Sequence, residues 1–386
     1  MDFTYDDEQD ALRDAVRGLL RKAYSDFEQR RRVTKTDPGF SERTWSQLAE
    51  MGLLGLPFAE ADGGVGAGPV EVGIVARELG SVLAPEPYLT SVVLAGGLVA
   101  ATGTAEQRAE VLGALTAGDS VLAFAHDEPG SRWAPTASAV SAAENGGSWT
   151  LTGVKEPVPH GVRADLLVVT AALPGGGTGA FLVAADAQGL SRDGYPTYDG
   201  GRAARIRFDG APATPLGEPG RDITKAVAEV LDTGRVMAGH EALGAMDFAI
   251  TTTTEYLRNR KQFGVPLSTF QALTFRAADM YIELELTQSL VQWATMVLEA
   301  GDRVRSADAA ARAALQVARA GRHIGHEAIQ LHGGIAMTAE YSVGVYAARL
   351  AALEHLLGDA QHHLATLSAA VGDHGALDPL AGPVPA

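Results

Sequence analysis

The hydrophobic spacing of this chain changes twice, from helical to alternating near Asp119 and back to helical near Asp222. Before the first change, apolar residues recur at helical spacing, as Leu12, Val16 and Leu19 do. Between the changes, short β-branched or alternating segments are separated by glycine-rich turns, which is typical of a small antiparallel β domain. We therefore predict an α+β multidomain protein: an all-α N-terminal domain (1–118), a middle antiparallel β domain (119–221), a C-terminal helical bundle (222–371) and a loose tail (372–386).

Capping residues and glycines predict where the N-terminal helices begin and end. Thr4 is expected to cap the first helix, and Gly52 to end a helix over 42–51. Three further helices are expected over 70–79, 88–101 and 105–115. In the middle domain, the segments that predict strands are 148–153, 164–173, 179–185 and 204–210.

The stretch YLRNRKQFGVPLSTFQ, residues 256–271, joins the cationic end of one long helix to the start of another. We place Arg258, Arg260 and Lys261 in the last helical turn, where cations complement the negative helix end. For this stretch alone, a solvated charge at the helix end is the commoner explanation of these residues.

The residues that follow predict a helix stop and a new helix start. Gly264 with Pro266 is expected to end the first helix, because neither residue favours its continuation. Ser268 is expected to cap the next helix, whose apolar face carries Leu273 and Met280.

Charge and cysteine content exclude several classes of function. The chain has 31 Lys and Arg against 47 Asp and Glu, a net charge of −16, and no basic stripe, which argues against nucleic acids and anionic membranes. It has no cysteine, so disulfides and thiolate chemistry are excluded. The acidic start MDFTYDDEQD does not match a secretory signal, and the most apolar run, 91–101, is too short to span a bilayer. We expect a cytoplasmic protein.

The pattern Arg-x-x-Phe-Gly followed by Gln, here Arg260, Phe263, Gly264 and Gln271, resembles the C-terminal domain of acyl-CoA dehydrogenases. The resemblance implies that the arginine reaches the pyrophosphate of an FAD held by a neighbouring subunit. It also implies that the phenylalanine and the glutamine line the same cofactor. The order of helices, β domain and helical bundle is that of the family, so the resemblance spans nearly the whole chain.

A second landmark, QLHGGIAMTAEYSVGVYAAR, contains Gln330, Gly333 and Gly334. Two glycines after a helix allow a backbone turn that admits a ligand closely, although they also explain a plain helix stop. The resemblance implies that this glutamine and glycine pair binds the adenine end of the flavin. It further assigns Gln361 and Asp127 to the cofactor, with Asp127 at a position where a hydroxyl residue is common.

The family resemblance implies FAD-dependent α,β-dehydrogenation of an acyl-CoA thioester, which needs a carboxylate base for the α proton. The two positions at which the family carries that glutamate correspond to Leu357 and to Gly234, and neither can accept a proton. Nearby acids are weak candidates, because a shift of one or two residues redirects a side chain. They are Asp359 first, then Glu354 and Glu241.

The middle domain both matches and departs from the family pattern. The Glu-Pro-Gly turn and the Gly-x-Lys pair are present at 128–130 and 153–155. Where the family has a flavin-stacking tryptophan and a hydroxyl donor, this chain has Pro157 and Pro159, which supply neither an aromatic face nor a donor. The departures fall at the chain's own ring and substrate site, whereas the residues that reach across an interface are kept.

This selective loss makes the chain most similar to the small subunit of pimeloyl-CoA-type acyl-CoA dehydrogenases, with steroid side-chain enzymes as the related comparison. We expect a heterotetramer with a larger catalytic homologue, an acyl-CoA substrate and an electron-transfer flavoprotein as acceptor. A complete homotetrameric enzyme with an unusual base, and a non-catalytic binding homologue, stay open. No metal is expected, because no cysteines or acidic clusters accompany the histidines at 332, 355, 362 and 363.

Overall fold

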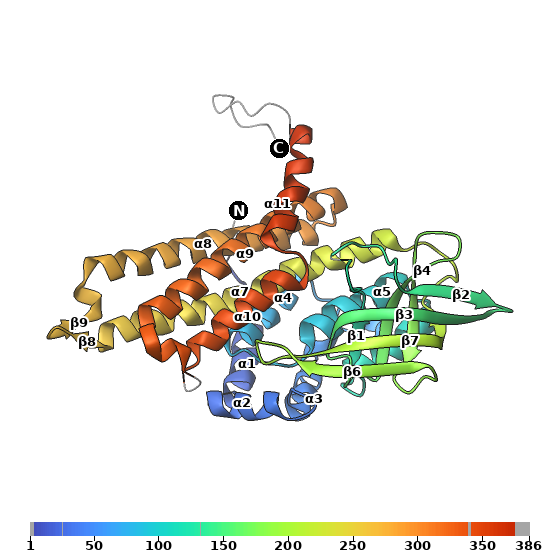
Figure 1. Ribbon diagram of the computed structural model, residues 1–386, viewed down its shortest axis with the longest axis horizontal. Coiled ribbons are helices and arrows are strands. Elements are labelled where there is room, and N and C mark those ends of the chain that lie inside the picture. Colours follow the sequence, from blue (N-terminus) through green and yellow to red (C-terminus); the bar gives the residue numbers. More distant parts are fainter. Residues whose placement is uncertain (1–3, 25, 132, 339–340, 375–386) are drawn as a thin grey trace.

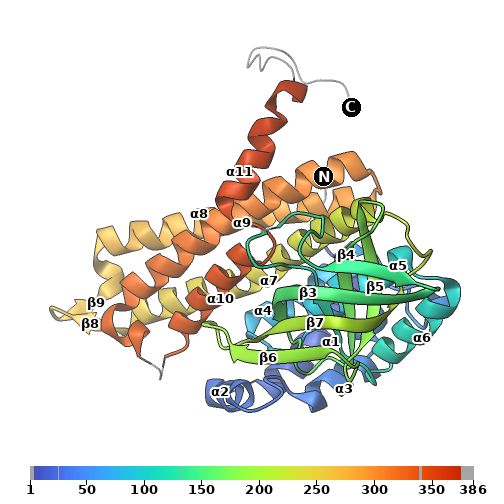
Figure 2. The same cartoon turned by 45° about the vertical axis from the view of Figure 1, so that its right-hand side comes forward.

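The computed structural model describes residues 4–24, 26–131, 133–338 and 341–374 (Figure 1). An N-terminal group of helices packs beside a β sheet, and a bundle of long helices extends away from that sheet (Figures 1 and 2). This arrangement of helices, sheet and bundle confirms the predicted fold class.

The N-terminal helices begin and end close to the predicted limits. Asp6, not Thr4, caps the first helix: its carboxylate accepts from the Gln9 N–H at 2.8 Å, and the Gln9 side chain accepts from the Asp6 N–H. The helix over 27–35 was not predicted, because FEQRRRVTK carries too few apolar residues to show a period. The α-helices are α1 (Asp7–Ala23), α2 (Phe27–Lys35), α3 (Glu42–Glu50), α4 (Pro69–Ser81), α5 (Gly97–Thr102) and α6 (Ala105–Thr116), with short 3₁₀ turns η1 (Leu53–Gly55) and η2 (Glu60–Asp62).

The segment predicted as one α-helix over 88–101 has two parts. Its first part, η3 (Tyr88–Gly96), is π-helical and buried on every side, and α5 continues from it. A helix that is apolar all round leaves no stripe from which its period can be read.

Within the described residues, seven strands form one sheet with the order β1-β4-β2-β3-β7-β5, and β6 pairs with β7. Most pairings of the sheet are antiparallel, as predicted, but β1 runs parallel to β4. The β2–β3 hairpin lies between them in sequence and makes a connection long enough for parallel pairing. The strands are β1 (Leu122–Ala125), β2 (Ser141–Asn145), β3 (Ser148–Pro159), β4 (Leu166–Ala172), β5 (Thr178–Ala184), β6 (Leu190–Pro196) and β7 (Arg202–Pro215).

The C-terminal bundle is built on one long buried helix, α7, which contacts α4, α8, α9 and α10. Glycines bring α4 and α7 together: a Cβ at Gly244 would lie 2.0 Å from the Arg77 carbonyl oxygen, and one at Gly80 would lie 1.9 Å from the Glu241 carbonyl oxygen. The elements are α7 (Thr224–Asn259), β8 (Lys261–Gln262), β9 (Val265–Pro266), η4 (Leu267–Thr269), α8 (Gln271–Glu299), α9 (Arg303–His332), η5 (Gly333–Met337), α10 (Val343–Leu356), α11 (Ala360–Ala369) and η6 (Val371–His374).

The connection from α7 to α8 differs from the predicted stop and start. Arg260 is the extended residue that ends α7, so Arg258 alone of the three cations lies in the last turn, and Lys261 belongs to β8. Phe263 and Gly264 form the hairpin tip, with φ of 54° and 83°, as a two-residue hairpin turn requires. The turn thus sits four residues beyond the helix end.

Two further expectations concern the helix start and the chain end. Ser268 lies in η4 and does not cap α8, which begins after Phe270 without a side-chain cap. Most of the expected loose tail lies outside the described residues, which end with η6. In the described ranges, no helix combines the length and the apolarity that a membrane span needs.

Candidate functional site

The outer end of the bundle gathers residues that are far apart in sequence. Tyr256 of α7 and His332 of α9 stack with ring centroids 4.5 Å apart, and Tyr341 lies 5.0 Å from His332. These ring contacts bring the hairpin and the end of α9 together. Six of the eight sequence-predicted cofactor residues lie on these segments: Arg260 and Phe263 on the hairpin, Gln271 at the start of α8, Gln330 at the end of α9, and Gly333 and Gly334 in η5.

The side chains of this outer end are exposed. Phe263 is 92% exposed, although it is a large apolar residue. Among the described residues, the Arg260 guanidinium has no hydrogen-bond or ion-pair partner, and nothing lies within 4 Å of a Cβ placed at Gly333 or Gly334. An available guanidinium, a bare aromatic ring and open backbone fit a dinucleotide, since they offer contacts to its phosphates and rings.

This surface lies at the far end of the bundle from the β sheet (Figures 1 and 2). The β8–β9 hairpin is at one extreme of the long axis, and the loop after β1 is on the other side of the molecule. One chain therefore cannot close its own outer end around a ligand held by its own middle domain.

The other two predicted cofactor residues lie apart from this set. Asp127, after β1, is half-buried and lines a cavity of about 350 Å³ together with Pro157, Trp133 and His355. Burial raises the pKa of Asp127 to about 6. Gln361 is an exposed residue of α11. Sequence reasoning thus assigned to one cofactor residues that this chain holds at two separate places.

A buried ion pair holds the loop that carries Asp127. Lys155 Nζ lies 2.8 Å from Glu128 Oε1, and both side chains are almost fully buried. Glu128 also accepts from the backbone N–H groups of Ala139 (2.7 Å) and Val140 (2.9 Å). Burial opposes its ionisation, but the Lys155 cation and these donors hold the pKa of Glu128 at about 2. The Glu-Pro-Gly turn and the Gly-x-Lys pair are thus two halves of one contact.

The cavity beside this loop does not fit a flavin ring in the way that the family pattern implies. Pro157 forms part of its wall, where an aromatic face is missing. Three acidic residues, Asp127, Glu128 and Glu156, also line it. Pro159 pairs in register with Ala203 at the end of β3 and has no N–H to donate.

The two positions at which the family resemblance locates a base meet in space. A Cβ placed at Gly234 would lie 3.0 Å from Leu357 Cδ1 and 2.5 Å from Leu94 Cδ2. The site where a carboxylate would stand is therefore packed with leucine side chains. Beside it, Arg235 donates to the Leu357 carbonyl oxygen at 2.9 Å and to Asp232 at 2.6 Å.

Each weak base candidate has another partner in the structure. Asp359 caps α11 and accepts from the His362 N–H at 2.8 Å. Glu354 is buried and paired with Arg322. Glu241 accepts from Arg349 Nε at 2.7 Å. These contacts give the three acids structural roles.

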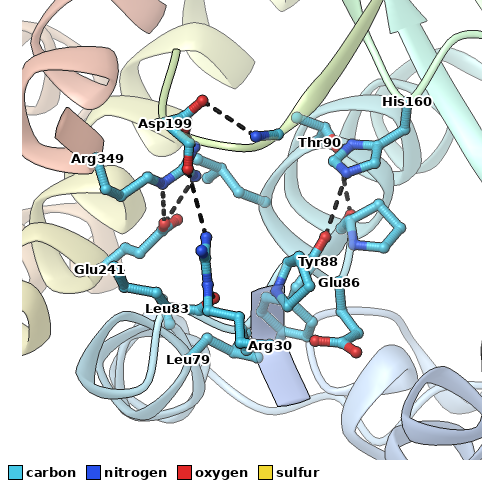
Figure 3. A pocket seen from close by; sticks show the side chains of 16 residues that line it. Arg30, Leu79, Leu83, Glu86, Tyr88, Thr90, His160, Asp199, Glu241 and Arg349 are labelled. Atoms are coloured by element: carbon cyan, nitrogen blue, oxygen red, sulfur yellow. Dashed lines mark hydrogen bonds and ion pairs between the residues drawn. The ribbon is translucent and has the colours of Figure 1, made fainter. Parts of the chain in front are cut away.

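A small cavity lies between the N-terminal helices, the middle domain and the bundle, and Figure 3 shows its charged lining. Its volume is about 60 Å³, enough for a few waters at roughly 10–15 Å³ each. Arg349 points toward both Asp199 and Glu241, with contacts of 2.8 and 2.7 Å (Figure 3). Arg30 donates to the Leu83 carbonyl oxygen at 2.6 Å.

Glu86 is a second buried acid of this cavity. Its Oε1 accepts from the Tyr24 hydroxyl and from the Ser41 N–H at 3.3 Å, whereas Oε2 has no partner in the described part of the chain. Burial raises the pKa of Glu86 from 4.5 to about 7. Because the folded-state pKa is raised, the proton stabilises the fold below pH 4.5, and this contribution is lost as the pH rises through 7.

Glu86→Gln is expected to remove this pH dependence, because the amide keeps an acceptor for Tyr24 and Ser41 but cannot ionise. At pH 8 the variant should be more stable by up to about 3 kcal/mol, because the buried Glu86 carboxyl, whose pKa is raised to about 7, is then ionised in the unsubstituted chain. Urea unfolding from pH 4.5 to 8 measures this, with the exposed Glu50→Gln as control. Equal pH slopes for Glu86→Gln and the unsubstituted chain would contradict the assignment.

Sequence reasoning missed three contacts around these cavities. Arg349 ends the second glycine landmark, but its partners come from a turn and a helix far away in sequence. Trp133 lies only three residues after the Glu-Pro-Gly turn, and its closeness to that matched motif was a usable signal. The sequence showed Glu128 and Lys155 only as parts of two separate motifs and did not show that they form an ion pair. Within the described residues, no group of three or more metal-ligating side chains gathers.

Comparison with known families finds two matches along the chain. The family model for the acyl-CoA dehydrogenase N-terminal domain matches residues 6–119, and that for the acyl-CoA dehydrogenase C-terminal domain matches residues 224–372. Among curated proteins, the acyl-CoA dehydrogenase FadE27 of Mycobacterium tuberculosis is 31% identical over 371 residues, covering 94% of this chain and 97% of that protein.

Solved structures with similar folds include two multi-protein systems. The Tcur3481-Tcur3483 steroid ACAD, solved as a variant, is 33% identical with a TM-score of 0.86, covering 96% of this chain and 99% of that chain. The ChsE4-ChsE5 complex from Mycobacterium tuberculosis is 28% identical with a TM-score of 0.88, covering 97% and 100%.

Proposed function

Because the chain belongs to the acyl-CoA dehydrogenase family, we propose that it works as one subunit of a heterotetramer whose homologous partner supplies the catalytic glutamate. The family consists of FAD-dependent oxidoreductases that act on the CH–CH bond of acyl-CoA thioesters. When bound, FAD supplies the hydride acceptor for α,β-dehydrogenation.

In the proposed assembly, the outer end of the bundle binds the cofactor held by the partner. Arg260 pairs with the diphosphate, and Phe263 and Gln271 line the same molecule. Gln330 and the glycine pair of η5 bind its adenine end. The open guanidinium and the exposed Phe263 support this role, because both sit where a second chain can reach them.

One observation carries the proposal. The outer end of the bundle, where the dinucleotide would bind, is open, whereas the space around Gly234 and Leu357, where a catalytic base would stand, is filled. Leu357 and Leu94 occupy the space around Gly234, so no carboxylate can be added there without displacing core side chains. A chain that kept its own catalysis would need a base within hydrogen-bond reach of the substrate. Asp359 stays the remaining candidate base for a homotetrameric enzyme, although it caps α11.

One similar protein supports the proposed substrate class. The steroid ACAD supports an acyl-CoA from sterol breakdown as the substrate, and an acyl-CoA from fatty acid breakdown is the alternative. We place the reaction in the cytoplasm, with an electron-transfer flavoprotein as the acceptor. The ChsE4-ChsE5 complex also supports a heteromeric assembly.

Flavin content tests the proposal. The chain is purified alone and after co-expression with a homologous acyl-CoA dehydrogenase encoded beside it, and flavin absorbance is compared with protein concentration. We expect no flavin on the single chain and about half as many flavins as chains in the complex, since each flavin lies between two unlike chains.

Two other outcomes would contradict the proposal. A single chain with about one FAD per subunit, bleached by an acyl-CoA, would indicate a complete homotetrameric enzyme. In that case, loss of bleaching in Asp359→Ala, but not in Glu354→Ala, would identify the base. Absence of flavin in both preparations would indicate a non-catalytic homologue.

A further inference from the structure

Trp133 ties the middle domain to the end of α10. Its indole Nε1–H donates to the His355 carbonyl oxygen at 3.0 Å, and its ring lies 5.4 Å from the ring of His362. Trp133 has a φ of 58°, a left-handed conformation that is unfavourable for a non-glycine residue and is kept only where surrounding contacts hold it. The contact therefore fixes the loop after β1 against the bundle.

Arg349 makes a second tie six residues earlier on the same helix. Its guanidinium lies 2.8 Å from Asp199, in the turn between β6 and β7, and 2.7 Å from Glu241 of α7. Figure 3 shows the three side chains pointing toward one another at the cavity. The Asp199 side chain is only 4% exposed and that of Arg349 is 27% exposed, so the contact is partly buried and less screened than a surface pair. Both ties join α10 to the middle domain.

We propose that Trp133, which lines the cavity beside Asp127, and Arg349, which lines the cavity of Figure 3, together clasp α10 to the middle domain and so close the cavity of Figure 3 to an acyl chain in this subunit. This deepens the proposed function, on which it rests for the assignment of catalysis to the partner. The clasp separates two roles of the subunit. The outer end of its bundle binds the cofactor held by the neighbouring subunit, while the cavity of Figure 3 excludes substrate.

The chemistry of the cavity supports exclusion. An apolar chain entering it would have to separate Arg349 from its two carboxylates, and breaking a buried pair leaves uncompensated charge. Glu86 and Tyr88 add buried oxygens without partners among the described residues, which favour water over methylene groups. The remaining volume of about 60 Å³ holds waters only.

The absence of cysteine in the sequence allows a direct accessibility test on the full chain. Ala76 is 3% exposed and lines the cavity, so Ala76→Cys places a single thiol there. The reagent is octyl methanethiosulfonate, whose alkyl chain matches a medium acyl chain. The reaction rate is measured with the clasp intact and in the Trp133→Ala and Arg349→Met backgrounds. We expect at least about a tenfold increase in each, the ratio that corresponds to 1.4 kcal/mol.

Matched controls separate opening of the clasp from general loosening. Arg163 resembles Arg349 in contacting two carboxylates, those of Glu42 and Asp165, but does not line the cavity. Trp293 of α8 is partly buried against the core and does not line the cavity either. Arg163→Met and Trp293→Ala should leave the reaction rate of the thiol in the Ala76→Cys chain within about twofold, because a loss of under 0.5 kcal/mol is usual for independent sites. A thiol introduced at the exposed Ser46 should react equally fast in every background.

An equal reaction rate of the Ala76→Cys thiol with and without the clasp would overturn the proposal. So would a control substitution, Arg163→Met, that raises this rate as much as Arg349→Met does. If Trp133→Ala or Arg349→Met fails to fold by circular dichroism, Trp133→Phe and Arg349→Lys replace them. The phenylalanine lacks the N–H donor, and the lysine cannot reach two carboxylates as a planar fork does. The single chain needs no flavin in this assay, so its failure is distinct from a failure of the flavin-content test.

Discussion

Replacing Lys155 with methionine is expected to lower the free energy of unfolding by about 3–5 kcal/mol, because it leaves the buried Glu128 carboxylate without its cation. The effect should be large since both side chains are nearly inaccessible to water. The substitution should also loosen the loop after β1 that carries Asp127, because Glu128 in this loop accepts hydrogen bonds from the backbone of Ala139 and Val140. Urea unfolding followed by circular dichroism measures the change.

A second substitution tests whether the missing charge causes the loss. Adding Glu128→Gln to Lys155→Met should recover part of the stability, because no bare carboxylate is left buried and the amide oxygen still accepts backbone hydrogen bonds. Arg31→Met, which removes a surface pair with Glu28, is the control and should cost under about 1 kcal/mol. A Lys155→Met loss no larger than that of Arg31→Met would show that the pair is not essential.

Replacing Arg260 with alanine is expected to weaken flavin binding by the co-purified complex by roughly 10- to 100-fold, since a charge-assisted hydrogen bond contributes about 1.5–3 kcal/mol. Stability of the single chain should not change, because the side chain has no partner in the described part of the chain. Flavin content after dialysis and equilibrium titration with FAD measure the loss.

Neighbouring substitutions sharpen the Arg260 experiment. Arg258→Ala removes an exposed cation two residues earlier, in the last turn of α7, and should leave flavin binding unchanged. Arg260→Lys keeps the charge but loses the planar fork, so it should recover only part of the affinity. Equal losses from Arg258→Ala and Arg260→Ala would indicate a general effect of charge at this surface.

The fold class was predictable because the spacing of apolar residues and the residues that begin or end an element are local signals. Leu12, Val16 and Leu19 repeat at helical spacing, and α1 indeed covers them. The predictions failed where an element depends on residues that are distant in the sequence. The start of α8 shows this, because Ser268 has the composition of a helix cap, but the hairpin sets where the helix begins. The parallel pairing of β1 with β4 depends on the whole sheet, which no single segment encodes.

The candidate site was predictable only in part, for a similar reason. The resemblance identified Arg260 and the empty base positions at Gly234 and Leu357, and the structure shows that these two positions meet. It did not identify Arg349, whose partners come from the turn at Asp199 and from α7. Ion pairs across long sequence distances follow from packing, and a single sequence does not show packing.

The central claim is that Arg260 serves a cofactor between two unlike chains, and a structure of the flavin-loaded complex tests it most directly. The account predicts that the Arg260 guanidinium lies within hydrogen-bond distance of the pyrophosphate of an FAD whose ring is held by the partner. It also predicts that no flavin lies beside Leu357 of this chain. A structure with Arg260 in open solvent, away from any subunit junction, would contradict it.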